Sequence, residues 1–311
     1  MIRYVKYQDI DETAWDKCIR KSFNGLVYAY SWYLDIVHDE WDALVEGDYE
    51  RVMPLTGNRK WGISYLFQPY FVQQLGVFSK NLLTPEITGD FLKNIPAHYR
   101  YIDIRMNSFN KVDDEGFTVF YHKNHLLDLI NSYEKIAARY STQTKRNLKN
   151  SGKYKLTLMK NIKPESIVKL FRENRGKGLA KWSDRHYSIL RTLMYAAIYK
   201  GMGVAYGVFS ERNELCAGTF FLKSKNRLIF LFSGADEAAR QNSAMTFLID
   251  SVIRAYARHQ VVLDFEGSDN PQLARFYRGF GASEITYPGL LLNRLPFPLR
   301  PLLDLRRKLK K

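Results

Sequence analysis

Cysteine is scarce in this 311-residue chain, which has only Cys18 and Cys216, far apart in the sequence. This scarcity excludes a disulfide framework and a cysteine-based metal site, and it favours a reducing compartment in which both thiols are free. Long apolar runs are also missing, since none approaches the ~20 residues of a transmembrane helix. The charged N-terminus, MIRYVKYQDIDE, lacks the apolar centre of a signal peptide. We therefore expect a cytoplasmic protein.

Common catalytic signatures are absent as well. The chain contains no G-x-S-x-G, P-loop, H-E-x-x-H or G-x-G-x-x-G sequence, which argues against the enzyme classes that these motifs mark. His122 and His125 stand three positions apart, but a single such pair beside Lys123 is typical of a surface loop. No metal site is predicted.

What the chain has in excess is positive charge. It carries 47 Lys and Arg against 32 Asp and Glu, a formal net charge of +15. Such a surplus favours anionic partners, such as phosphates, nucleic acid or acidic lipid head groups. The hydrophobic fraction of 46% is normal for a globular chain. A chain of this length is expected to form one large domain or two ordinary ones.

The most informative stretch is VVLDFEGSDNPQLARFYRGFG at 261–281. Its apolar start predicts a short buried strand, on which Asp264 and Glu266 share one face because strand side chains alternate. A polar turn follows, and the next proline is predicted to begin a helix that Asp269 or Asn270 caps. Carboxylates and an amide thus gather at the carboxyl end of a strand, where open α/β sheets commonly bind ligands.

Strands and helices alternate along the rest of the chain. Residues 151–311 follow the order βααβββαβαβ, and the first half shows the same beginning and middle. Residues 126–150 are predicted to form a long helical connector, broken near Ser141, and residues 70–77 a strand. The sequence therefore predicts an α/β chain with mixed sheets, divided into domains at 1–150 and 151–311.

The pattern DFEG-S-x-N-P…A-R-F-Y-R-x-F-G resembles the closing segment of the FemAB-like and GNAT-type acyltransferases. In those families a turn Asn precedes a helix that carries an aromatic pair and ends at a Gly. The resemblance extends upstream to 228–257 and to STQTKRNLK at 141–149. It implies two tandem GNAT-like domains joined by the connector, and an N-acyltransferase with acyl-CoA or aminoacyl-tRNA as the donor and no metal.

Three residues are predicted to be catalytic. In GNAT enzymes a tyrosine on the closing helix protonates the leaving thiolate of CoA, and the resemblance places Tyr277 there; a phenol can serve as a general acid. Asp264 and Glu266 would orient or deprotonate the attacking amine, with Glu266 nearer the open end of the strand. The alternatives are structural: Tyr277 is a core aromatic, and the carboxylates bind backbone amides or arginines.

One departure from the family pattern bears on the donor. The FemAB peptidyltransferases carry F-K-x-x-F-G, with a lysine at the position of Tyr277. Such a cation would help to polarise the ester carbonyl of an aminoacyl-tRNA. Its replacement by a tyrosine disfavours aminoacyl-tRNA as the donor.

Six residues are predicted to contact the donor. The segment GADEAARQNSA at 234–244 occupies the strand-to-helix junction at which a GNAT domain holds the CoA pyrophosphate, because helix N-termini bind anions. The expected Q/R-x-x-G-x-G/A signature is incomplete, since Ser243 stands where a glycine should follow Arg240. The segment serves equally well as a plain helix N-terminus, and Asn270 as a turn and capping residue. The predicted set is Ser233, Gly234, Arg240, Gln241, Asn242 and Asn270.

Another set is predicted to bind the substrate. In FemAB-like proteins a similar S-x-x-x-R-x-x-x-K segment lies beside a groove, so a phosphate-bearing substrate is expected at the basic cluster; the alternative is a solvated helix face. An arginine beside an exposed aromatic suits carbohydrate, nucleobase or peptide contacts. The predicted set is Lys145, Arg146, Lys149, Trp182 and Arg275.

The C-terminal tail at 290–311 combines three prolines, an apolar stretch at 302–305 and five final basic residues. It is either a peripheral contact with an anionic inner membrane surface or a packed or solubilising end.

The function predicted from the sequence is transfer of an acyl group from a thioester or ester donor to an amine, such as a peptide or lipid-linked cell-wall precursor. The alternatives are aminoacyl-tRNA-dependent peptidyl transfer and a non-catalytic module that binds RNA or another anion through its basic face.

Overall fold

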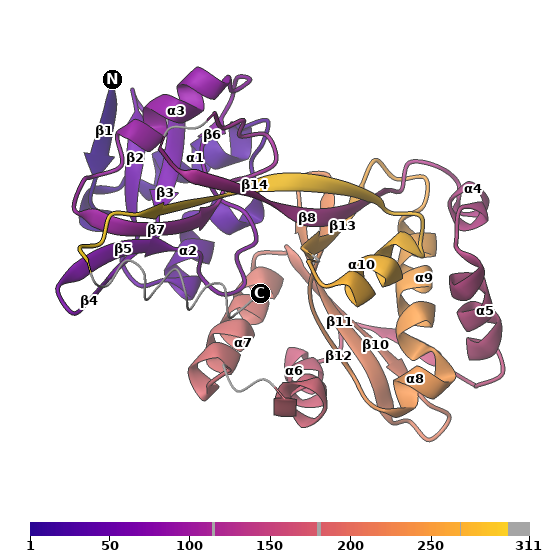
Figure 1. Cartoon of the computed structure of the whole chain (residues 1–311). Coiled ribbons are helices and arrows are strands. Elements are labelled where there is room, and N and C mark those ends of the chain that lie inside the picture. The colour runs from indigo at the N-terminus through magenta and orange to yellow at the C-terminus, as the bar shows by residue number, and fades with distance from the viewer. Residues whose placement is uncertain (114–115, 179–181, 268, 298–311) are drawn as a thin grey trace. The chain divides into compact units, whose positions relative to one another are not determined.

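The computed structural model describes residues 1–113, 116–178, 182–267 and 269–297, which divide into two compact units (Figure 1). Unit 1 comprises Met1–His122 and the segment that starts at Thr286, and unit 2 is Lys123–Ile285. Strands β8 (Thr118–Asp128) and β14 (Ser283–Asn293) each contribute residues to both units. The boundary expected at residue 150 lies in unit 2, within helix α5 (Thr142–Ser151).

Unit 1 contains an antiparallel sheet in the order β1-β2-β3-β6 and a second set of strands in the order β4-β5-β7-β14. Leu44, Phe91 and Ile102 are among the buried side chains of its core. The strands are β1 (Ile2–Val5), β2 (Asp42–Glu46), β3 (Arg51–Leu55), β4 (Gly57–Lys60), β5 (Ile63–Phe67), β6 (Phe78–Ser79) and β7 (Tyr99–Arg105). The helices are α1 (Glu12–Lys21), α2 (Ser31–Val37) and α3 (Pro85–Lys93), with short 3-10 turns η1 (Tyr7–Asp9) and η2 (Val27–Ala29).

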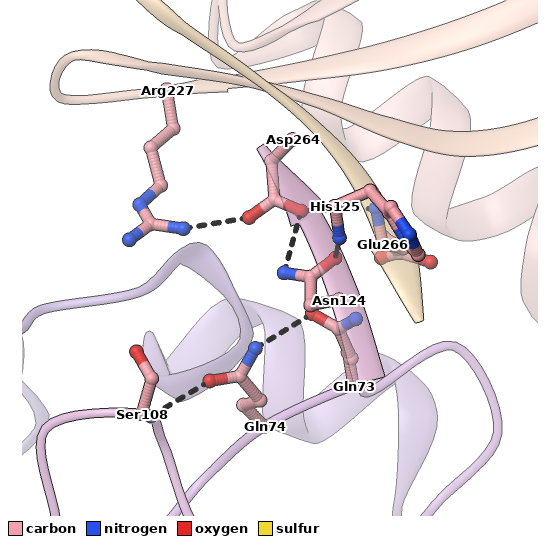
Figure 2. A network of polar contacts seen from close by, with 8 residues as sticks. All are labelled: Gln73, Gln74, Ser108, Asn124, His125, Arg227, Asp264 and Glu266. Carbon is pink, nitrogen blue, oxygen red and sulfur yellow. Dashed lines mark hydrogen bonds and ion pairs between the residues drawn. The ribbon is translucent and has the colours of Figure 1, made fainter. Parts of the chain in front are cut away.

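The strand predicted at 70–77 is wrong: only Leu75 forms a backbone bridge there, with Met106, and side-chain amides make several of the segment's other hydrogen bonds. Asn107 Nδ2 donates to the carbonyl oxygen of Leu75, and the backbone nitrogen of Val77 donates to Asn110 Oδ1. Gln74 Nε2 donates to Gln73 Oε1, and its own Oε1 accepts from the backbone nitrogen of Ser108 (Figure 2). The sequence does not reveal such a buried polar cluster, because its members come from segments about 30 positions apart.

Unit 2 is built on strands in the order β8-β13-β12-β11-β10-β9. The pair β12–β13 is parallel and its other pairs are antiparallel, so the chain must cross over between β12 and β13, which it does through two helices. The strands are β9 (Thr157–Lys160), β10 (Gly203–Phe209), β11 (Leu215–Ser224), β12 (Arg227–Ala235) and β13 (Val262–Gly267).

Helices cover both faces of this sheet (Figure 1). On one face α6 (Pro164–Glu173) packs on β11 and β12, and α7 (Asp184–Tyr199) packs on β10. The approach of α6 requires a glycine, because a Cβ at Gly234 would lie 2.6 Å from the carbonyl oxygen of Ile167. On the other face lie α9 (Ala244–Tyr256), α5 against it, and α10 (Pro271–Arg278). The remaining elements are η3 (Arg175–Gly178), α4 (Tyr133–Ala138) and α8 (Ala238–Asn242).

The connector predicted at 126–150 is only partly helical. Residues 126–128 are the end of β8, and they pair with β13. The helices α4 and α5 follow, and the break near Ser141 is confirmed, because Ser141 caps α5 by accepting from the backbone nitrogen of Thr144.

Several expectations concern the surface and the tail. No helix in the described ranges is long and apolar enough to cross a membrane. Of the tail predicted to contact a membrane, Leu290–Asn293 form the end of β14, and 298–311 lie outside the described residues. Both cysteines are buried, free thiols.

Candidate functional site

A cavity of about 700 Å³ opens in unit 2 at the carboxyl end of β12, between α6, α8 and the start of α10. Three of the predicted donor-binding residues, Ser233, Arg240 and Asn270, line it together. The end of β12 and the start of α10 thus converge on one cavity, whereas Asp264 and Glu266, at the end of β13, are not among its lining residues. The full lining is Phe171, Glu173, Asn174, Arg175, Ser233, Ala235, Asp236, Glu237, Ala239, Arg240, Met245, Asn270, Gln272 and Leu273.

Tyr277 does not line this cavity and is part of the buried core of unit 2. It is 6% exposed, and its ring stacks on Phe265 with centroids 4.6 Å apart. Burial raises the pKa of its phenol, the negative charge of Glu266 raises it further, and Arg175, which lines the cavity, lowers it. Tyr277 is therefore a neutral phenol, a potential proton donor, at physiological pH.

The two candidate carboxylates of β13 have different surroundings (Figure 2). Asp264 is 2% exposed, and Arg227 Nη1 donates to its Oδ2 at 2.6 Å. Its Oδ1 accepts from Asn124 Nδ2 and from the backbone nitrogen of Glu266, each at 2.9 Å. An ion pair and two further hydrogen bonds occupy both oxygens of Asp264, which gives this carboxylate a structural role.

Glu266 is half-buried and sits in a β-bulge. Its φ is +59°, and the register between β13 and β8 shifts between Asp264 and Gly267. Positive φ is costly for a side-chain-bearing residue, and bulges of this kind redirect side chains near functional sites. The hydrogen bond from its backbone nitrogen to Asp264 holds the bulge in place. Of the two carboxylates, Glu266 is thus the one that the backbone turns out of the regular strand.

The junction between β12 and α9 differs from an open phosphate cradle. The backbone nitrogen of Ala239 donates to Asp236 Oδ1 at 2.7 Å, and that of Ala244 donates to Asn242 Oδ1 at 2.9 Å. Ala239 belongs to the short helix α8, which lies between β12 and α9 in the sequence. Two of the backbone amides that could bind an anion at this junction therefore bond to the chain's own side chains.

The remaining members of the predicted donor set have structural contacts. Gly234 lies under α6, and Asn242 is buried. The carbonyl oxygen of Gln241 accepts from Asn150 Nδ2, which ties α5 to the junction. Asn270 caps α10, because its Oδ1 accepts from the backbone nitrogens of Gln272 and Leu273.

The predicted substrate-binding residues do not form one cluster. Arg146 and Arg275 line a separate groove between α5 and α10. Lys145 Nζ donates to the carbonyl oxygen of Ala138, and Lys149 is exposed in the last turn of α5. Trp182 packs with other aromatic rings of α6, α7 and β12, namely Phe171, Tyr187 and Phe232.

Sequence reasoning missed several residues around the site. Asp236 and Glu237 line the cavity, and their position directly before a helix was a capping signal. Arg227 and Asn124 could not be paired with Asp264 from the sequence, because 37 and 140 positions separate them from it. The surface loop expected around His122 and His125 is wrong, because both lie on β8. His125 is fully buried next to Tyr277, with ring centroids 6.0 Å apart, and burial lowers its pKa. No group of three or more His, Cys, Asp or Glu side chains in the described ranges is arranged to hold a metal ion.

Residues 139–272 match the acetyltransferase (GNAT) domain family. This range runs from the end of α4 to the first turn of α10 and includes the whole lining of the 700 Å³ cavity except Leu273. The expectation of a GNAT-type N-acyltransferase domain is confirmed. No match is found among curated proteins.

Solved structures share the fold over nearly the whole chain. A crystal structure of FemX is 10% identical, with a TM-score of 0.64 over 95% of this chain and 98% of that one. A tandem GNAT protein from the clavulanic acid biosynthesis pathway is 11% identical, with a TM-score of 0.53 over 95% and 99%. L-PGS from Bacillus licheniformis is 11% identical, with a TM-score of 0.51 over 89% and 90%. The prediction of two tandem GNAT-like domains of mixed α/β class is confirmed.

Proposed function

Because residues 139–272 form a GNAT-type acetyltransferase domain, we propose that unit 2 transfers an acyl or aminoacyl group from a phosphate-bearing carrier to an amine. In this proposal the acyl group occupies the cavity at the end of β12. Tyr277 and Glu266 are not among the lining residues, but Arg175, which lines the cavity, is close enough to Tyr277 to lower the pKa of its phenol. Most of the rate enhancement comes from holding amine and carbonyl together, which removes the entropic cost of their encounter.

The proposed reaction uses two side chains. The nitrogen of the acceptor attacks the carbonyl carbon, and a C–N bond forms while the bond from that carbon to the carrier's oxygen or sulfur breaks. Glu266 accepts the proton that the nitrogen loses, and Tyr277 donates a proton to the leaving atom. Proton exchange with solvent restores both groups. Asp264 acts as a positioning residue, because it holds the backbone of Glu266 in the bulge.

The distribution of positive charge along the chain is the main reason for preferring one donor over the other. Unit 2 contains 27 Lys and Arg against 14 Asp and Glu, a net +13, while the rest of the chain has 20 against 18, a net +2. Nearly the whole surplus thus belongs to the unit with the acyltransferase domain. A charge of this size suits a polyanionic carrier better than a small one. We therefore favour an aminoacyl ester of RNA as the donor, despite the tyrosine at position 277.

The lining of the cavity fits the same donor. Glu173, Asp236 and Glu237 bring carboxylates to it, against two arginines. The α-ammonium group of an aminoacyl ester complements these carboxylates, whereas the diphosphate of CoA would be repelled by them. FemX and L-PGS have the same fold. Acyl-CoA is the second candidate, favoured by the acetyltransferase description of the matched family.

Thermal unfolding in the presence of donor analogues tests whether the aminoacyl ester of RNA or acyl-CoA is the preferred donor. We expect an RNA whose 3′ end carries an amide-linked amino acid to raise the Tm, because a ligand at ~100 times its Kd adds about 2.7 kcal/mol to the free energy of unfolding. For a unit of this size that is a shift of about 5 °C or more. The same RNA without the amino acid should give a smaller shift, because it leaves the cavity empty. A larger shift with acetyl-CoA than with the RNA analogue would contradict the preferred donor.

A further inference from the structure

A second groove, of about 840 Å³, runs between the start of α5 and α10. Its lining is Ser141, Thr142, Gln143, Thr144, Arg146, Asn147, Gln272, Arg275, Phe276, Arg278 and Gly279. All of these residues belong to unit 2. The lining contains three arginines and, among the described residues, no carboxylate.

The two helices that form the groove are fixed to each other. The backbone nitrogen of Ser141 donates to the carbonyl oxygen of Gly279 at 2.9 Å. A Cβ at Gly279 would lie 2.6 Å from Thr144 Oγ1, so only glycine permits this approach. The arginines are therefore presented from a rigid frame, which lowers the entropic cost of binding a ligand between them.

The positive charge of the groove is only partly balanced, since Arg278 is close enough to Glu284 to help lower the pKa of that carboxyl group. Neither Arg275 nor Arg278 forms a salt bridge with any residue in the described ranges, and both are exposed. Arg146 Nη2 donates to Gln143 Oε1, which is a neutral partner. Like charges that converge raise the electrostatic energy of the free protein, and an anion bound among the three arginines lowers it.

The sequence around α5 extends this positive surface. Residues 135–163 contain nine Lys and Arg and no Asp or Glu. A carrier that enters the groove with one phosphate can therefore place further phosphates along basic side chains. Guanidinium groups suit this ligand because each can donate two parallel hydrogen bonds to one phosphate.

The groove also offers a binding site for the phosphates of the donor, which the first cavity does not readily accommodate. Two backbone amides at the β12–α9 junction bond to Asp236 and Asn242, which leaves fewer donors there for the phosphates of a carrier and favours a second binding site. Gln272, in the first turn of α10, lines both the cavity and the groove. A donor that spans this turn would place its acyl group on one side and its phosphates on the other.

We propose that the groove between α5 and α10 binds the phosphate groups of the donor's carrier through Arg146, Arg275 and Arg278. This inference rests on the proposed function of unit 2 for the identity of the carrier. The matched family range ends at residue 272, so it includes neither Arg275 nor Arg278.

Binding of unacylated carriers tests the groove without turnover. Fluorescence anisotropy of a labelled single-stranded oligoribonucleotide is measured from low to moderate salt, with the wild-type chain and the Arg275→Gln/Arg278→Gln variant. We expect the variant to bind at least 10-fold more weakly at low salt. The slope of log affinity against log salt should become shallower by about 1.4, since each phosphate contact to a single strand contributes about 0.7. Both side chains are exposed, so the variant should fold normally.

A matched control removes two positive charges elsewhere in unit 2. The Arg212→Gln/Lys169→Gln variant has the same net charge, with its changes at exposed positions on the β10–β11 turn and on α6. It should lose less than 3-fold in affinity. Equal losses in the two variants, or no binding of the oligoribonucleotide and of CoA by the wild-type chain, would overturn the proposal.

Competition with CoA identifies the source of the phosphates. If CoA displaces the oligoribonucleotide from the wild-type chain, and its own affinity falls in the Arg275→Gln/Arg278→Gln variant, the groove binds the phosphates of a thioester carrier. If CoA does not compete, the groove binds a polynucleotide. A chain that binds either carrier in the groove but forms no amide would refute the proposed function and leave this site intact.

Discussion

Replacement of Tyr277 by Phe is expected to lower kcat at least 100-fold while the protein remains folded. General acid catalysis contributes about 10²- to 10⁴-fold, and this variant removes the proposed acid and nothing else. The phenylalanine ring keeps the stacking on Phe265 and the burial in the core. The measurement is single-turnover transfer at saturating donor, which isolates the chemical step from donor binding.

Tyr140→Phe is the matched control, because Tyr140 is a buried tyrosine of the same core whose ring contacts Phe280. Its kcat should stay within a few-fold of the wild-type value. A Tyr277→Phe enzyme that is as fast as this control would remove Tyr277 from the mechanism and leave it a core aromatic. A leaving group of low pKa should restore much of the lost rate, because it needs no proton to depart.

Replacement of Arg227 by Met should destabilise unit 2 by about 3–5 kcal/mol, because it leaves the charge of Asp264 buried without its partner. The Asp264 side chain is only 3% exposed and that of Arg227 17%. The loss is comparable with the whole stability of many domains, which is about 5–15 kcal/mol. Denaturant-induced unfolding, followed by a probe in unit 2, measures it.

Two further variants separate the ion pair from other effects. Lys169→Met breaks an exposed pair with Glu173, and it should cost less than about 1 kcal/mol. Arg227→Met combined with Asp264→Asn removes both charges and should recover at least half of the loss. If Arg227→Met alone costs no more than Lys169→Met, Asp264 does not depend on Arg227, and its assignment as a positioning residue is wrong.

Local sequence patterns predicted the elements around the site well. The strand before Asp264, the cap at Asn270 and the helix that begins at Pro271 follow from alternation, turn chemistry and the fixed φ of proline, all of which act within a few residues. The break at Ser141 was found for the same reason. The family resemblance added the tandem GNAT arrangement, which no local pattern contains.

Long-range contacts explain what the sequence did not predict. The ion pair of Asp264 is with Arg227, 37 positions earlier. Arg275 lines a groove with the start of α5, about 130 positions earlier. The strand expected at 70–77 failed because Asn107 and Asn110, about 30 residues later, bind its backbone. Similarly, the sequence shows that α5 is basic, but only its packing against α10 reveals that Arg146, Arg275 and Arg278 line one groove.

The most direct test of the central claim is the fate of a labelled acyl group. The wild-type chain is incubated with an RNA that carries a labelled aminoacyl ester at its 3′ end and with a set of primary amines, and the products are identified by mass spectrometry. Our account predicts that the label moves from the ester to an amide and that free RNA accumulates in equal amount. The absence of an amide above the uncatalysed rate, from this ester and from acyl-CoA alike, would contradict it.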